Sequence, residues 1–364
     1  MALTQVQSGI LADSTQTYGM KNRVINGDMR IDQRNAGASV TGNDGIYVAD
    51  RWRTEASQSG KLTMQQNQGS VTPPAGFRNY AGLTSSSAYS LLSTDRFGLA
   101  QWIEGYNVSD LNFGTANAST FTLSFWVRSS LTGTFGVGVL GYDEGSAFRS
   151  YVTTYTIASA NTWTYVSITI PGDTSGTWSV ANGHGLYVNF NLGFGSNYTK
   201  AAGSWGAGLF YGPPGATSVV GTSGATFYIT GVQLEKGSTA TQFDYRPFGT
   251  ELALCQRYFI SYGGTTGYER VAVGVCNNTT GASVSTFLPV PMRAQPSLGY
   301  SAVGNFGVYD GGNVYAVTAI AMDQQTNQIA SFQFTVASGL TTNRTAQIVT
   351  NNTTAARLTL SAEL

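Results

Sequence analysis

The chain has 364 residues, and its 19 Lys and Arg residues balance 19 Asp and Glu residues, so the formal net charge is zero. Charged residues make up 10% of the chain, against about 25% in an ordinary soluble protein. A neutral, charge-poor chain lacks the cations needed to neutralise phosphates, which excludes nucleic acid as a partner. An apolar content of 41% excludes general disorder. Abundant uncharged polar side chains and aromatic rings suit sugars or rigid assemblies.

The first 22 residues form an expected N-terminal segment. Leu3, Val6 and Ile10 stand at three- and four-residue spacing and would form an apolar stripe on a short helix. So short a helix needs a partner, so we expect a segment for oligomerisation or attachment, with a frayed terminus as the alternative. No secretory signal is recognisable here, and no stretch of the chain has the length and apolarity of a membrane helix. We expect no membrane insertion.

From about residue 23, apolar and polar residues alternate with a period of two. In residues 121–128, Phe121, Leu123 and their alternate neighbours lie on one face, with polar residues, Trp126 and Arg128 on the other. This alternation is typical of antiparallel sheets with one face in a core. Strands separated by Gly- and Pro-rich turns are predicted at residues 121–128, 135–139, 164–170, 186–192 and 226–234. Such an array indicates a sandwich or jelly roll.

A domain boundary is predicted where Pro247 follows the last of these strands. A short helix is expected at residues 251–258. Further strands are expected at residues 283–288, 314–322, 329–336 and 357–360. The prediction is therefore an all-β chain: an N-terminal segment (1–22), a jelly-roll sandwich (23–248) and a smaller C-terminal β-sandwich (249–364). Cys255 and Cys276 could pair or remain two buried thiols.

A search for catalytic residues mostly fails. The chain has one histidine, His184, in a turn-like stretch typical of a solvated residue, and it lacks the G-x-S-x-G, H-E-x-x-H and C-x-x-C patterns. Its acids are scattered singly, apart from Asp143 and Glu144 in an expected hairpin turn. A glycosidase needs two acids at a defined separation, and sequence spacing nominates no such pair. No catalytic residue, metal ligand or cofactor is therefore predicted.

Sugar binding is predicted because pyranose faces stack on aromatic rings while amides and Arg satisfy the hydroxyl groups. The candidates on strands are Trp126, Arg128, Tyr187, Asn189 and Asn191. The candidates in loops are Trp178, Trp205, Tyr198 and Tyr211. Glycines at positions 136 and 138 would leave a groove beside them. The alternative is that this outer face packs against a neighbouring subunit or lies beneath a loop.

Three pairs of segments carry a family resemblance. They are residues 26–34 (NGDMRIDQR) with 47–52 (YVADRW), 227–237 (FYITGVQLEKG) with 243–247 (FDYRP), and 251–259 (ELALCQRYF) with 288–296 (LPVPMRAQP). These resemble modules of bacteriophage tail fibers and other receptor-binding appendages. The first two pairs resemble the opening and closing strands of a carbohydrate-binding-module-like jelly roll, and the third resembles the β-domain that often follows it.

The resemblance implies a virion protein made in the host cytoplasm. It implies a non-catalytic tail fiber that attaches through its N-terminus to other tail or baseplate proteins, forms a homotrimer and recognises a bacterial surface polysaccharide. A structural head fiber, decoration or adaptor protein is one alternative, and a capsule-degrading depolymerase is another.

The resemblance also bears on individual residues. Trp52 is expected as a core anchor, and Gly231 as a bulge in the closing strand. Cellular modules of this shape often hold a structural calcium through acids on the closing strand. Thr230 and Gly231 stand there in this chain, so that ligand pair is absent. Four oxygen donors remain nearby: Asn26, Asp28, Glu235 and Asp244.

Overall fold

The computed structural model describes residues 20–142 and 148–364. The chain divides into two compact units between Arg246 and Pro247, two residues before the predicted boundary. The predicted N-terminal stripe of Leu3, Val6 and Ile10, and the acidic pair Asp143 and Glu144, lie outside the described residues.

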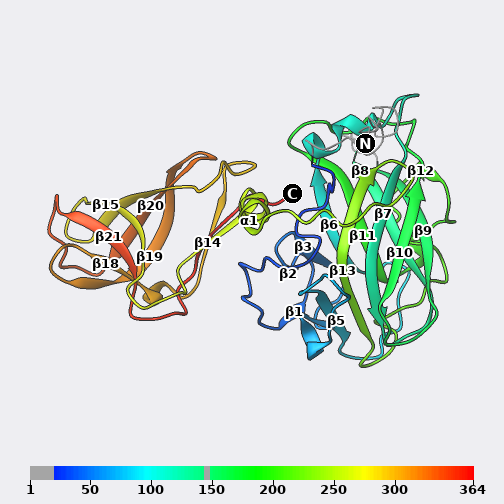
Figure 1. The fold of residues 1–364 in the computed structure, drawn as a ribbon. Coiled ribbons are helices and arrows are strands. Elements are labelled where there is room, and N and C mark those ends of the chain that lie inside the picture. The colour runs from blue at the N-terminus through cyan, green and yellow to red at the C-terminus, as the bar shows by residue number, and fades with distance from the viewer. Residues whose placement is uncertain (1–19, 143–147) are drawn as a thin grey trace, which may run out of the picture. The chain divides into compact units, whose positions relative to one another are not determined.

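The first unit is a sandwich of two antiparallel sheets (Figure 1). Sheet A has the order β1 (Val40–Gly42), β4 (Leu62–Gln66), β5 (Ala81–Ser85), β13 (Thr226–Lys236), β7 (Phe121–Ser129) and β10 (Thr164–Ile170). Sheet B has the order β12 (Trp205–Ala207), β9 (Phe148–Ile157), β8 (Gly133–Tyr142), β11 (His184–Phe194), β6 (Arg96–Glu104), β3 (Trp52–Ala56) and β2 (Tyr47–Ala49). Short 3₁₀ turns lie at Gln68–Ser70, Gly105–Asn107, Ser109–Leu111 and Ser196–Tyr198. The predicted all-β class is confirmed.

Alternation along the strands builds the core between the two sheets. On β7, Phe121, Leu123, Phe125 and Val127 are fully buried, as the period-two pattern requires. Trp52 is also fully buried, and its ring lies 6.2 Å from that of Phe190. The expectation of a core tryptophan is confirmed.

The first pair of segments in the resemblance, residues 26–34 and 47–52, is joined by hydrogen bonds. The Asn26 side chain donates hydrogen bonds to the main-chain oxygens of Ile31 and Asp50, at 2.8 and 2.9 Å. The Trp52 indole donates to the main-chain oxygen of Asn26 at 2.9 Å. Asn26 and Arg51 both adopt positive φ angles, 57° and 71°, which a non-glycine residue holds only when its surroundings fix it. These hydrogen bonds tie residues 26–31 to the start of β3.

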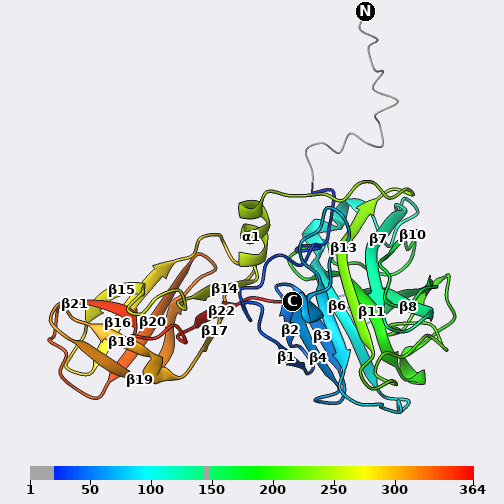
Figure 2. The same ribbon diagram turned by 60° about the horizontal axis from the view of Figure 1, so that its bottom comes forward.

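The second unit begins with helix α1 (Phe248–Gln256) and continues as strands (Figure 2). A three-stranded sheet has the order β14 (Phe259–Tyr262), β22 (Leu358–Ser361) and β17 (Ser297–Tyr300). A closed barrel has the order β15 (Arg270–Cys276), β16 (Gly281–Phe287), β20 (Ile329–Val336), β19 (Val314–Gln325), β18 (Phe306–Tyr309) and β21 (Thr345–Thr350). One more 3₁₀ turn lies at Val303–Asn305.

The second unit therefore differs from the expected smaller sandwich in having a barrel. Pairing of β15 with β21 closes the ring, so no barrel strand leaves an open edge. Cys255 and Cys276 are both buried and are not joined by a disulfide, which corresponds to the second of the two alternatives. Among the residues that the structure describes, no helix is long and apolar enough to cross a membrane.

Candidate functional site

Two aromatic residues pair across neighbouring strands on the outer face of sheet A. Trp126 of β7 stands opposite Tyr165 of β10 in the register, and their ring centres are 5.3 Å apart. Because Phe125 and Val127 point into the core, Trp126 points outward, where it is half-buried. Tyr165 is 46% exposed. The pair forms an aromatic surface that solvent reaches.

A bulge in β13 makes room for a third ring beside this face. The register between β13 and β7 shifts between Thr230 and Gln233, and Gly231 there has a φ of +62°. A Cβ at Gly231 would lie 2.6 Å from the Phe77 ring. Gly231 therefore supplies both the backbone conformation and the space that Phe77 occupies, and the predicted bulge is confirmed.

The segment after β13, residues 238–245, is named here the closing strap. Two buried side chains of β13 fix it. The Glu235 carboxylate accepts hydrogen bonds from the main-chain N–H and the hydroxyl of Thr241, at 2.8 and 2.7 Å. The Gln233 side chain accepts one from the Asp244 N–H at 2.8 Å. The motif that resembles a closing strand thus holds the strap in place.

The closing strap adds two more rings to Phe77. The ring centres of Phe77 and Phe243 are 5.2 Å apart, and those of Phe243 and Tyr245 are 4.8 Å apart, both edge to face. The Tyr245 hydroxyl donates to the main-chain oxygen of Gly76 at 2.8 Å. Burial, followed by the negative charge of Asp28, raises the pKa of Tyr245, so this hydroxyl stays protonated at neutral pH.

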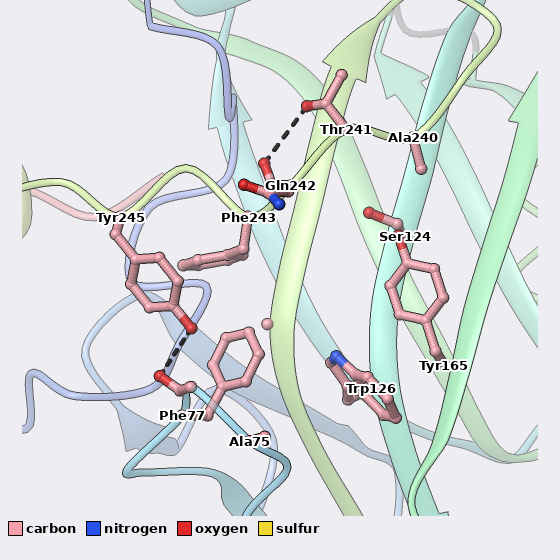
Figure 3. Close-up of a pocket in the computed structure, with 12 residues that line it drawn as sticks. Ala75, Phe77, Ser124, Trp126, Tyr165, Ala240, Thr241, Gln242, Phe243 and Tyr245 are labelled. Carbon is pink, nitrogen blue, oxygen red and sulfur yellow. Dashed lines mark hydrogen bonds between the residues drawn. The ribbon is translucent and has the colours of Figure 1, made fainter.

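These elements enclose an open pocket of about 510 Å³, within the range of roughly 300–1,000 Å³ typical of small-molecule sites. Figure 3 shows Trp126 and Tyr165 on one side of β13, and Phe77, Phe243 and Tyr245 on the other. The other lining residues are small or uncharged: Ala75, Gly76, Ser124, Gly231, Ala240, Thr241 and Gln242. We name this site the aromatic pocket. No acidic, basic or histidine side chain is among its lining residues.

Arg128, predicted to bind sugar beside Trp126, lies on the same outer face of β7 and contacts other neighbours. Its guanidinium carbon lies 5.4 Å above the centre of the Tyr228 ring, and its Nε donates to the main-chain oxygen of Asn161 at 2.9 Å. Arg128 does not line the aromatic pocket. The side chain stacks on one neighbour and bonds another, and the role of Arg128 in sugar binding stays a prediction.

The prediction of a sugar-binding surface on β11 needs correcting. Tyr187 and Asn189 are fully buried and Asn191 is 2% exposed, so none reaches a ligand in this structure. Residues 209–213, named here the covering segment, lie over this face: the ring centres of Tyr187 and Tyr211 are 6.1 Å apart, and a Cβ at Gly212 would lie 2.5 Å from the side-chain nitrogen of Asn191. The Tyr187 hydroxyl donates to the Glu55 carboxylate. Burial, and then the charge of Glu55, raises the pKa of Tyr187 well above its ordinary value.

The predicted groove at two β8 glycines is filled by the covering segment. A Cβ at Gly138 would lie 2.5 Å from the main-chain oxygen of Tyr211, and a Cβ at Gly136 would lie 2.5 Å from the Pro213 ring. The glycines therefore allow close packing of the backbone. Tyr211 is buried in this packing, and Tyr198 lies against it with ring centres 5.7 Å apart.

Trp178 and Trp205 belong to an aromatic cluster of the fold. Their ring centres are 5.4 Å apart, and Phe113 lies 4.8 Å from Trp178. The Trp178 indole donates to the main-chain oxygen of Ser175, and that of Trp205 to the main-chain oxygen of Pro171. Trp178 is buried and Trp205 half-buried. Since both indole N–H groups are used inside the protein, these residues support the fold here.

The remaining sequence candidates for chemistry are also engaged within the protein. His184 begins β11, and its ring centre lies 4.4 Å from that of Trp102. Asn26 and Glu235 make the hydrogen bonds given above, and the Asp244 carboxylate accepts one from the Asn22 N–H. Within residues 20–142 and 148–364, no three His, Cys, Asp or Glu side chains come together as a metal site.

The aromatic pocket thus contains one predicted residue, Trp126. The missed aromatic residues are Phe77, Tyr165, Phe243 and Tyr245. Tyr165 carried a signal, because Val166 and Ile170 of the predicted strand are buried and place it on the outer face. The other three lie in loops with no periodicity to interpret.

No protein-family model and no curated protein matches the sequence. Among solved structures, the enzymatically active domain of tailspike protein 4 from bacteriophage CBA120 is similar at 13% identity and a TM-score of 0.34, over 59% of this chain and 21% of that chain. A family 11 carbohydrate-binding module from Clostridium thermocellum, in complex with a mixed-linked tetrasaccharide, is similar at 12% identity and a TM-score of 0.29, over 57% of this chain and 100% of that one. The matched region of this chain thus spans about one fifth of the length of the tailspike domain, 21%. Similarities of this strength assign neither a ligand nor an activity.

Proposed function

We propose that this protein is a non-catalytic carbohydrate-binding protein and that the aromatic pocket is its glycan site. The observation that carries the proposal is the pocket itself, in which two sets of aromatic rings face a space of small-molecule size. Aromatic faces pack against the C–H faces of sugar rings, and hydroxyl and amide side chains then fix the orientation of the sugar. Ser124, Thr241 and Gln242 supply such groups at the pocket.

The lining also supports a binding role over cleavage. Glycoside hydrolysis uses two carboxyl groups that flank the scissile bond, and the aromatic pocket is lined by none. The resemblance to phage appendage modules supports a place for this binding protein on a virion, as a trimeric tail fiber held by its N-terminal segment. A surface polysaccharide of the host is then the ligand.

The test uses the whole 364-residue chain and immobilised polysaccharides from bacterial surfaces. Trp126→Ala should weaken binding about 10- to 100-fold, as expected for a central aromatic contact. Tyr165→Ala should weaken it about 10-fold, the equivalent of about 1.4 kcal/mol. Tyr106→Ala is the matched control, because this 60% exposed tyrosine lies outside the pocket, and it should bind as the wild type does.

Three outcomes would count against the proposal. Equal losses of polysaccharide affinity in all three variants would show that the aromatic pocket is not the binding site. New reducing ends in the polysaccharide would indicate the depolymerase instead. A purified protein that neither binds cells nor inhibits phage adsorption, together with density on the capsid in a virion reconstruction, would favour the head-fiber or decoration alternative.

A further inference from the structure

We infer that the aromatic pocket selects uncharged sugar residues over acidic ones such as uronic acids. This inference rests on the proposed glycan-binding function and adds the class of sugar. The lining of the pocket contains five aromatic side chains and no charged side chain. An acidic sugar would need a cationic side chain near the pocket to pair with its carboxylate.

The charges on the closing strap and beneath it are already matched. The Glu235 carboxylate is 2% exposed and accepts the hydrogen bonds from Thr241. The Lys21 ammonium donates to the same Thr241 hydroxyl and to the main-chain oxygen of Gln242, both at 2.8 Å. One cation and one anion therefore meet at Thr241, and their charges offset each other.

The charges beside Tyr245 are matched in the same way. The Asp244 carboxylate lies 3.6 Å from the Arg246 Nε, and the Asp28 carboxylate lies 3.4 Å from the Arg30 Nε. Arg128, on the same strand as Trp126, stacks on Tyr228. Arg78 follows Phe77 in the chain, but it is exposed and does not line the pocket.

A carboxylate that enters this pocket would lose water and meet aromatic faces, whose π-electrons repel negative charge. Removing a charge from water without a partner is far more costly than removing a hydroxyl group that finds a hydrogen bond. An uncharged sugar avoids this loss, because its hydroxyl groups can bond to Ser124, Thr241 and Gln242. The lining therefore favours neutral rings.

The experiment measures binding of the whole 364-residue chain to matched oligosaccharides of glucose, galactose and mannose. Each is presented as the neutral hexose and as the corresponding uronate, which carries a carboxylate at C6. The expected result is binding of at least one neutral member, with its uronate at least 10-fold weaker. Affinity for the neutral member should also stay constant between about 50 and about 500 mM salt, because its binding involves no ion pair that salt could screen.

Two variants sharpen the test. Gln242→Arg places a cation at the pocket. It should improve uronate binding and so lower the ratio of neutral to uronate affinity at least threefold. Lys21→Gln removes the cation that already bonds Thr241 and Gln242 of the strap, and should leave the ratio of the two affinities unchanged. If Lys21→Gln changed the ratio of neutral to uronate affinity, the Lys21 ammonium would be contributing to sugar selection, and the inference would be overturned.

The failures of the two proposals differ. A uronate that binds as well as its neutral partner, with the loss on Trp126→Ala preserved, would overturn neutral selection but leave the glycan site standing. Binding to no member of the panel and to no bacterial polysaccharide would overturn both.

Discussion

The two outer faces of the sandwich start from the same kind of sequence and end in opposite states. On sheet A, β7 presents Trp126 outward, and the aromatic pocket keeps it within reach of solvent. On sheet B, β11 presents Tyr187 and Asn191 outward, and the covering segment buries both. The difference shows that alternation decides which side of a sheet a residue takes, while a third layer of chain decides whether that side is a surface.

Glycines serve opposite purposes on the two faces. Gly138 lets the covering segment approach the backbone of β8, which seals sheet B. Gly231 lets Phe77 pack over the bulge of β13, which builds one side of the pocket on sheet A. A small residue thus closes one face and shapes the other. Because all six tryptophans precede residue 206, tryptophan fluorescence of the full chain reports unfolding of the sandwich unit.

The largest expected effect comes from breaking the covered face. Tyr187→Ala should lower the free energy of unfolding by roughly 3–5 kcal/mol, because it leaves a cavity under the covering segment. Urea denaturation followed by tryptophan fluorescence measures this change. Glycan affinity of the folded protein should be unchanged, in contrast to Trp126→Ala. Tyr187→Phe, which keeps the ring and loses the bond to Glu55, should fall between this variant and the wild type, and a binding defect in either Tyr187 variant would contradict the separation of the faces.

A smaller effect is expected from lifting the covering segment. Gly138→Ala places a Cβ 2.5 Å from the main-chain oxygen of Tyr211, so the free energy of unfolding should fall by about 1–3 kcal/mol. Gly221→Ala is the control, since its Cβ would meet Ser218 at 3.3 Å and a small shift accommodates it. Hydrogen exchange of residues 209–213 should speed up in the first variant alone. Equal stability of the two variants would show that the segment is not held closely on sheet B.

The smallest expected effect is a dependence of stability on pH that arises on sheet B and leaves glycan binding on sheet A unchanged. Burial raises the pKa of Asp50, between β2 and β3 of sheet B, from 3.8 to about 6. On acidification from pH 7 to pH 5 the folded protein takes up a proton there while the unfolded chain stays ionised, so the contribution of Asp50 to stability rises as the pH falls.

The size of this gain is about 1 kcal/mol between pH 7 and pH 5. Asp50→Asn should lack it, and urea denaturation of both proteins at the two pH values measures the difference. Glycan binding should stay constant over the same range, because no acidic, basic or histidine side chain lines the pocket. Identical pH profiles for the two proteins would mean that Asp50 is not a titrating buried group.

The sandwich was largely predictable, and the site was not. The period-two pattern is a local property, so β10 and β20 occur at their predicted bounds, and the buried row of β7 is the predicted one. The aromatic pocket combines residues from near positions 77, 126, 165 and 243, and no local pattern relates segments so far apart. Only the pairing of β10 with β7 brings Tyr165 to Trp126.

The sequence by itself determined the all-β class, the core face of each main strand, the bulge at Gly231 and the uncharged polar character of the chain, because each depends on residue type and short-range order. The tertiary structure decided which outer face stays open, because residues 209–213 cover one sheet while the closing strap borders a pocket on the other. It also decided that the second unit closes into a barrel, since closure depends on the pairing of β15 with β21. Long-range pairing and loop packing obey no local period, and for that reason they appear only in three dimensions.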